Sequence, residues 1–98
     1  FNKASLELEQ YKSESQLELN KARRMFQDAK NNLKLTELAL QQSEEALRIR
    51  TNRFKEGLEK TTDLLMAETQ FSQKQLEYFT TVFQHNYALA YLEFLTKN

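Results

Sequence analysis

The chain contains no proline and a single glycine, Gly57, among its 98 residues. Turns in compact folds draw heavily on these two residue types, so this chain has few turns. Glu, Lys, Gln, Leu and Ala, which are good helix formers, dominate its composition. These features predict long helices and exclude a globule built from many short elements.

The first half of the chain carries a regular seven-residue repeat. Its large members are Leu19, Phe26, Leu33, Leu40, Leu47 and Phe54. Its small members are Ser15, Ala22, Ala29, Thr36 and Ser43. The steps between them alternate between four and three residues, which places both sets on one stripe of a helix. A repeat of this length predicts left-handed supercoiling against a partner helix, and the small positions allow a close approach.

A second apolar flank accompanies this stripe. It consists of Met25, Leu35, Leu38, Ala39, Ala46 and Ile49. Two apolar flanks predict a helix with neighbours on both sides.

The one clear break in the helical pattern lies around Gly57. Glycine adopts positive φ easily and is the usual residue just after a helix C-terminus. Thr61 or Thr62 is the expected N-cap of the next helix, and Asp63 suits its first turn. The sequence does not decide between the two threonines.

We therefore expect one all-α unit, a long antiparallel helical hairpin, with helices at about 3–56 and 62–96 and a turn at about 57–61. At 1.5 Å per residue the first helix extends about 30 Å beyond the second. The apolar residues of that extension, from Leu6 to Leu19, then lack a partner within the chain. We expect the chain to self-associate through its first helix, and to be part of a longer protein because it begins within a helical pattern.

Several function classes find no support in the residues. The 14 basic and 14 acidic residues balance, which argues against a nucleic-acid partner. There is no cysteine, and His85 is the sole histidine, so we expect no metal site or cofactor and interpret His85 as a packing or surface residue. Ser72 has no histidine at helical spacing, and we predict no enzymatic activity. No apolar run reaches the ~20 residues that a membrane-spanning helix needs.

The region around the break resembles a known family. Its residues are Arg53-Phe54-Lys55-Glu56-Gly57, then Thr61-Thr62-Asp63-Leu64-Leu65, then Ala67-Glu68 and Phe71. This pattern is similar to the hairpin tip of TolC-type outer-membrane efflux proteins, and the stretch Tyr87–Thr96 resembles the end of that family's second helix. The family places Tyr at Phe54, a basic residue at Glu59 and Asp at Met66 in some members, so its detailed gating network does not carry over.

The resemblance implies a fragment of the α-helical periplasmic tunnel of a homotrimeric outer-membrane export channel. Its tip would dock to a periplasmic adaptor (membrane fusion protein) that connects to an inner-membrane pump. The implied docking residues are Phe54, Gly57, Leu58, Thr61, Thr62, Asp63 and Leu64. Asp63 would also be an entrance gate, although a first-turn carboxylate has the simpler role of interacting with the helix dipole.

Two further alternatives stay open at this point. Arg48, Arg50, Arg53 and Lys55 either bind an acidic partner or act as a solvated group that favours the helix C-terminus. The chain as a whole is either a channel hairpin or a hairpin of an adaptor, or of another coiled-coil interaction module without a transport role. An adaptor hairpin should have two helices of similar length, which the pattern does not predict.

Overall fold

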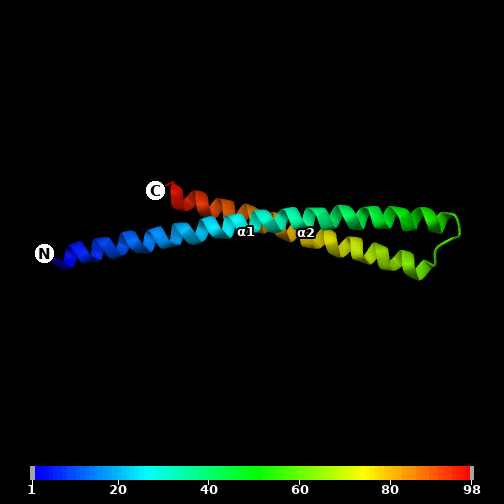
Figure 1. Cartoon of the computed structure of the whole chain (residues 1–98), viewed down its shortest axis with the longest axis horizontal. Coiled ribbons are helices and arrows are strands. Elements are labelled where there is room, and N and C mark those ends of the chain that lie inside the picture. Colours follow the sequence, from blue (N-terminus) through cyan, green and yellow to red (C-terminus); the bar gives the residue numbers. More distant parts are fainter. Residues whose placement is uncertain (1, 98) are drawn as a thin grey trace.

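The computed structural model describes residues 2–97, which form two long antiparallel helices. Helix α1 runs over Asn2–Lys55 and helix α2 over Thr61–Thr96. They pack along each other in a rod of 84 × 19 × 13 Å, with the connection at one end (Figure 1). The described residues contain no strand, so the predicted all-α hairpin is confirmed. The bounds lie within one residue of those expected from the sequence.

The connection closes α1 through backbone hydrogen bonds that surround Gly57. The Leu58 amide donates to the Arg53 carbonyl at 2.8 Å, and the Gly57 amide donates to the Phe54 carbonyl at 3.0 Å. This pair of bonds is a Schellman motif, and it requires a left-handed residue just after the helix. Gly57 has φ +76°, as predicted, and is the only described residue with a positive φ.

The start of α2 differs from the expectation. Its N-cap is Lys60, in an extended conformation and without a side-chain capping hydrogen bond. Thr61 and Thr62 already lie within the helix, so the prediction that one of them caps it was wrong. The Leu64 amide donates to the Lys60 carbonyl at 3.1 Å, so the helix begins one residue earlier than a threonine cap would allow.

The packed side of α1 follows the predicted seven-residue repeat from Leu19 to Leu47. Ala22 and Ala29 are buried, with Ala22 only 1% exposed. The large members between Leu19 and Leu47 are half-buried against α2. Phe54, predicted to continue the stripe, is exposed instead, because the helices separate near the connection (Figure 1).

Helix α2 contributes a matching repeat that the sequence analysis did not identify. Its large members are Leu64, Phe71, Tyr78, His85 and Leu92. Its second set is Ala67, Lys74, Thr81, Ala88 and Leu95. All of these positions are buried or half-buried. We call these two sets, together with those of α1 from Leu19 to Leu47, the seam.

Two direct contacts fix how the helices match along the seam. The rings of Phe26 and His85 lie 5.2 Å apart, and the hydroxyls of Thr36 and Thr81 lie 2.7 Å apart. Because both helices repeat every seven residues in opposite directions, the same match recurs along the rod. Layers of two large side chains thus alternate with layers in which α1 contributes a small side chain, and Ala88 falls opposite Ala29.

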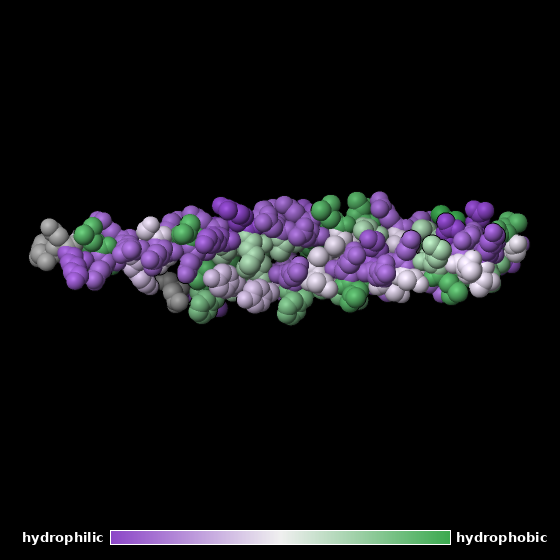
Figure 2. Space-filling model, turned by 90° about the horizontal axis from the view of Figure 1, so that it is seen from below, coloured by the Kyte–Doolittle hydropathy of each residue, from purple (hydrophilic) through white to green (hydrophobic). Residues whose placement is uncertain are grey.

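Much of the apolar surface lies outside the seam. Residues 3–18 of α1 are exposed throughout; we call them the overhang. Met25, Leu35, Leu38 and Ile49 of the second flank are exposed as well. In Figure 2 hydrophobic side chains project from the lower edge of the rod, along the stretch where α2 runs toward its C-terminal end. Neither described helix has a stretch long and apolar enough to span a bilayer.

Candidate docking tip

The residues that the resemblance assigns to docking lie together at one end of the rod. Phe54 is 40% exposed at the end of α1, and Leu58 is more exposed still in the connection. Thr61 and Thr62 are exposed in the first turn of α2. Residues 54–64, which we call the tip, therefore present two large apolar side chains and two hydroxyls to solvent. Such a surface can contact a protein partner through both apolar burial and hydrogen bonds.

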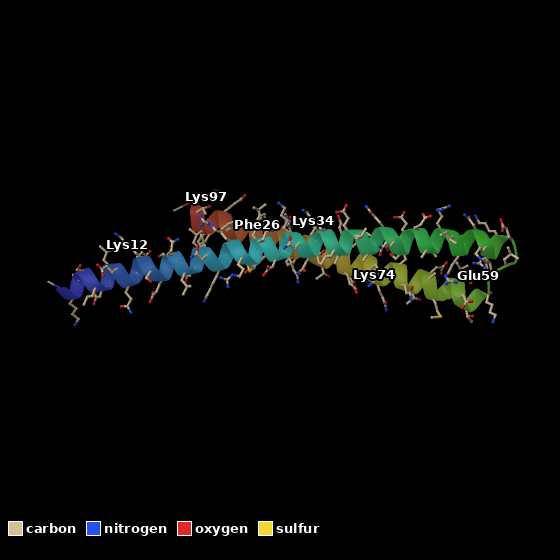
Figure 3. The ribbon with its side chains drawn as sticks, in the orientation of Figure 1. Lys12, Phe26, Lys34, Glu59, Lys74 and Lys97 are labelled. Atoms are coloured by element: carbon tan, nitrogen blue, oxygen red, sulfur yellow. The ribbon has the colours of Figure 1, made fainter. Side chains whose placement is uncertain are left out.

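The tip is held together by an ion-pair cluster around Glu59. Its carboxylate accepts a hydrogen bond from the Arg50 guanidinium at 2.8 Å, and the Arg53 guanidinium lies 3.4 Å from its other oxygen. The Glu59 side chain is only 7% exposed, whereas both arginines are largely in solvent. The cluster joins the connection to the last turns of α1, and Figure 3 places Glu59 at this end of the rod.

This cluster bears on one alternative that the sequence left open. Arg50 and Arg53 are engaged by a carboxylate of the same chain, so their charge is partly satisfied internally. Arg48 pairs with Glu45 one turn earlier, which raises the pKa of the Arg48 guanidinium and lowers the pKa of the Glu45 carboxyl, chiefly through their hydrogen bond. Three of the four basic residues near the end of α1 therefore form pairs within the chain, as expected for a solvated group.

Asp63 is half-buried in the first turn of α2. With Arg50, Met66, Ala67 and Gln70 it lines a small cavity of about 90 Å³ between the two helices. Leu64, next to it, belongs to the seam. Asp63 and Leu64 thus sit behind the exposed tip residues rather than among them, and the Asp63 carboxylate is placed where the positive end of the α2 dipole favours a negative charge.

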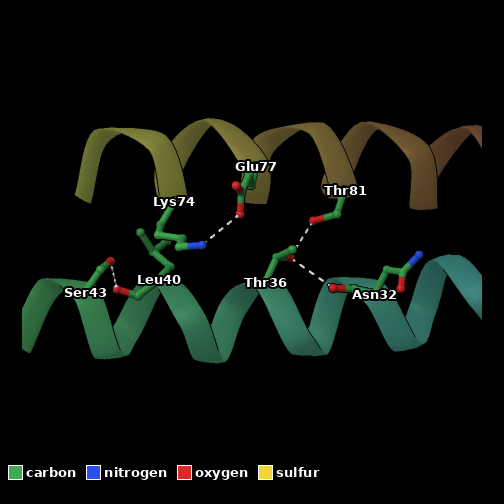
Figure 4. Close-up of polar contacts among 7 residues, drawn as sticks. All are labelled: Asn32, Thr36, Leu40, Ser43, Lys74, Glu77 and Thr81. Atoms are coloured by element: carbon green, nitrogen blue, oxygen red, sulfur yellow. Dashed lines mark hydrogen bonds and ion pairs between the residues drawn. The ribbon is translucent and has the colours of Figure 1, made fainter. Parts of the chain in front are cut away.

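A polar contact in the middle of the seam was not predicted. The Thr36 and Thr81 hydroxyls bridge the two helices, and the Thr36 hydroxyl also lies within hydrogen-bonding distance of the Asn32 carbonyl of its own helix (Figure 4). The Thr81 hydroxyl likewise lies within hydrogen-bonding distance of the Tyr78 carbonyl. Thr36 was recognised only as a small member of the repeat, and Thr81 was not singled out. A hydroxyl on a helix satisfies itself locally, so no sequence signal shows that two of them will meet across a seam.

The residues considered for catalysis or metal binding are not brought together. His85 packs against Phe26, in agreement with its interpretation as a packing residue. Ser72 is exposed on α2. Over residues 2–97 no group of three or more His, Cys, Asp or Glu side chains is arranged to hold a metal ion.

Comparisons with known proteins do not assign the chain to a family. No protein-family model, no curated protein and no solved structure matches it.

Proposed function

We propose that this chain is the periplasmic helical hairpin of a TolC-type outer-membrane export channel, and that its tip docks to a periplasmic adaptor. The observation that carries the proposal is the tip itself. A glycine-based turn at the end of an 84 Å rod presents Phe54 and Leu58 beside two threonine hydroxyls. These residues occupy the positions that the resemblance assigns to adaptor contacts.

Two other features support the proposal. The layers of the seam alternate between large and small side chains, which suits helices packed closely side by side in a wall. Helix α1 has 54 residues and α2 has 36, so α1 exceeds its partner by about 27 Å. Helices of unequal length favour a channel hairpin over an adaptor hairpin, and the overhang would then pack against further helices of the homotrimeric tunnel.

Asp63 would contribute to the closed entrance of that tunnel. By the resemblance, three copies of the hairpin end would bring three Asp63 carboxylates together at that entrance. Like charges at close range repel each other, so such a ring would attract cations. The adaptor, coupled to an inner-membrane pump, would open this ring on docking.

Site-specific photo-cross-linking in the full-length parent protein tests the docking. A photoreactive residue is placed at Leu58 or Thr62, both exposed at the tip, and at Glu37, exposed on the shaft of α1, as a matched control. We expect adducts that mass spectrometry identifies as a periplasmic adaptor from the two tip positions and none from Glu37. Adducts formed along the shaft and absent from the tip would refute the docking and would favour an interaction module without a transport role.

A further inference from the structure

The face of α2 turned away from α1 carries a stripe of large apolar side chains. Its members are Leu76, Phe79, Phe83, Tyr87 and Phe94. Each of them is 61–71% exposed, although they follow one another at helical spacing over about 27 Å. We call these five residues the outer stripe. Contiguous exposed apolar patches of this kind mark interaction surfaces more often than they form ordinary solvent-facing surface.

The charge distribution sets this part of α2 apart from the rest of the chain. Charged residues make up 29% of the chain, but residues 78–92 contain no Asp, Glu, Lys or Arg. A helical segment that carries no charged residue around its circumference is one that packs against other elements on more than one face. The seam covers one side of α2, and the outer stripe lies on the other.

A groove extends the outer stripe toward α1. Phe83 and Tyr87 form its apolar α2 side, whereas its α1 side combines Met25 with the charged residues Lys21, Arg24 and Asp28. The groove is open to solvent and has a volume of about 600 Å³. It gives the uncharged surface a concave edge into which side chains of a second helix can fit.

The solvent-exposed area of the chain shows how much surface is available for a partner to bury. The chain exposes 8016 Å², whereas a compact monomer of 11.7 kDa exposes about 5,900 Å². The difference of about 2,100 Å² exceeds the ~800 Å² that each partner contributes to a standard protein interface. The excess is therefore large enough to supply one interface of this size.

We propose that the outer stripe of α2 is a self-association surface on which a second copy of the chain docks through the same stripe. When two uncharged faces pack together, no charge is buried without a partner. A partner with a charged face would lose the hydration of its charges, and the stripe offers no opposite charge in compensation. The formal net charge of zero means that two copies do not repel each other. Between two copies of the chain outside its parent protein, a two-fold axis through the stripe joins the two hairpins into a four-helix assembly.

The overhang of α1 is a weaker surface for the same role. Glu7, Glu9, Glu14 and Glu18 outnumber Lys3 and Lys12 along it, so two overhangs that met would bring like charges together. The α2 surface thus replaces α1 as the expected route of self-association. This inference does not depend on docking at the tip, since the tip lies beyond the stripe.

Sedimentation equilibrium of the chain with two matched variants tests the proposal. Phe83→Glu places a charge in the outer stripe, and Leu8→Glu places the same charge on an exposed leucine of the overhang. We expect the unmodified chain to form dimers near 100 µM, Phe83→Glu to weaken association at least about tenfold, and Leu8→Glu to leave it unchanged within about twofold. A monomer at every concentration, or association lost in Leu8→Glu and kept in Phe83→Glu, would overturn the proposal.

A distance measurement covers the case in which Phe83→Glu fails to fold. The chain has no cysteine, so a spin label can be attached to a single introduced cysteine. The two positions are Gln84, beside the stripe, and Lys34, on the outer side of α1. Packed helices lie about 10 Å apart, so we expect label separations below about 20 Å for Gln84→Cys and above about 30 Å for Lys34→Cys. The reverse order of distances would show that α1 forms the contact and would refute the proposal.

Discussion

The hydroxyl pair in the seam, Thr36 and Thr81, allows a quantitative test of how the two helices hold together. Two hydroxyls have two hydrogens between them, and the 2.7 Å bridge uses one. The other hydrogen is donated to a carbonyl of its own helix, which is Asn32 or Leu33 for Thr36 and Tyr78 for Thr81. Replacing one threonine by valine removes the bridge but leaves the remaining hydroxyl able to donate locally.

The expected cost follows from this arrangement. A buried donor left without a partner costs about 1–3 kcal/mol, but the local carbonyl prevents that outcome here. Each single Thr→Val variant should therefore lose only the net value of one hydrogen bond, about 1 kcal/mol. Val and Thr have nearly the same shape and both are β-branched, so helix propensity and packing change little. The double variant replaces both partners by apolar groups and should lie within about 0.5 kcal/mol of the original chain.

Urea unfolding at one fixed protein concentration measures the four members of this double-mutant cycle. The expected coupling energy is about 1.5–2.5 kcal/mol, because the second substitution restores what the first one lost. In thermal unfolding each single variant should lower Tm by about 4–8 °C. If the double variant loses the sum of the two single losses, the hydroxyls do not interact across the seam and the reasoning is refuted.

Three further predictions concern other parts of the rod. Gly57→Leu should destabilise the hairpin by about 1 kcal/mol or more and Gly57→Asn by less. No atom lies near an added Cβ, so only the positive φ opposes the substitution, and Asn tolerates that conformation better than Leu. Chemical unfolding of both variants measures the two losses, and equal losses would contradict the prediction. Ala88→Leu should cost about 1–3 kcal/mol, since Ala88 is 2% exposed in a small layer of the seam; no loss of Tm would show that the layer has room. The Glu45 carboxyl should titrate in NMR below its ordinary pKa, and Arg48→Gln should return it to the usual range. The lowered pKa means that the pair's contribution is present above the unfolded pKa and is lost as the pH falls through the folded one.

The fold could be predicted from sequence because two strong signals agree. The absence of proline and the single glycine limit the chain to one turn, and the repeat from Leu19 to Leu47 gives one helix a packed side. Gly57 then places the turn. The sequence pattern extended the packed stripe to Phe54, which is exposed in the structure. The Schellman motif directs the chain away from α1, and a periodic pattern does not show where two helices separate.

The repeat in α2 was missed for a different reason. Its seam includes Lys74, Thr81 and His85, while larger apolar residues such as Phe79 and Phe83 lie outside it. A search for the most hydrophobic face therefore selects the wrong side of this helix. The seven-residue spacing from Leu64 was the available signal, and it identifies the seam only when polar members are accepted.

The candidate site was predictable in position and less so in detail. The tip residues fall at the connection because Gly57 fixes it. The ion pairs of Glu59 depend on how residues 56–60 fold back on α1, which no periodicity describes. Arg50 and Arg53 were correctly grouped as basic residues near a helix end, but their acidic partner comes from beyond the turn.

The short connection has a consequence for how the rod assembles. Closing residues 56–60 costs little chain entropy, since loop-closure cost rises with loop length. The first layers of the seam to meet are then those nearest Gly57, and each completed layer brings the next pair of side chains into range. The hairpin should zip from its closed end toward the overhang and fray in the opposite direction. Amide hydrogens near Leu47 should therefore exchange more slowly than those near Leu19, even though both residues belong to the same stripe.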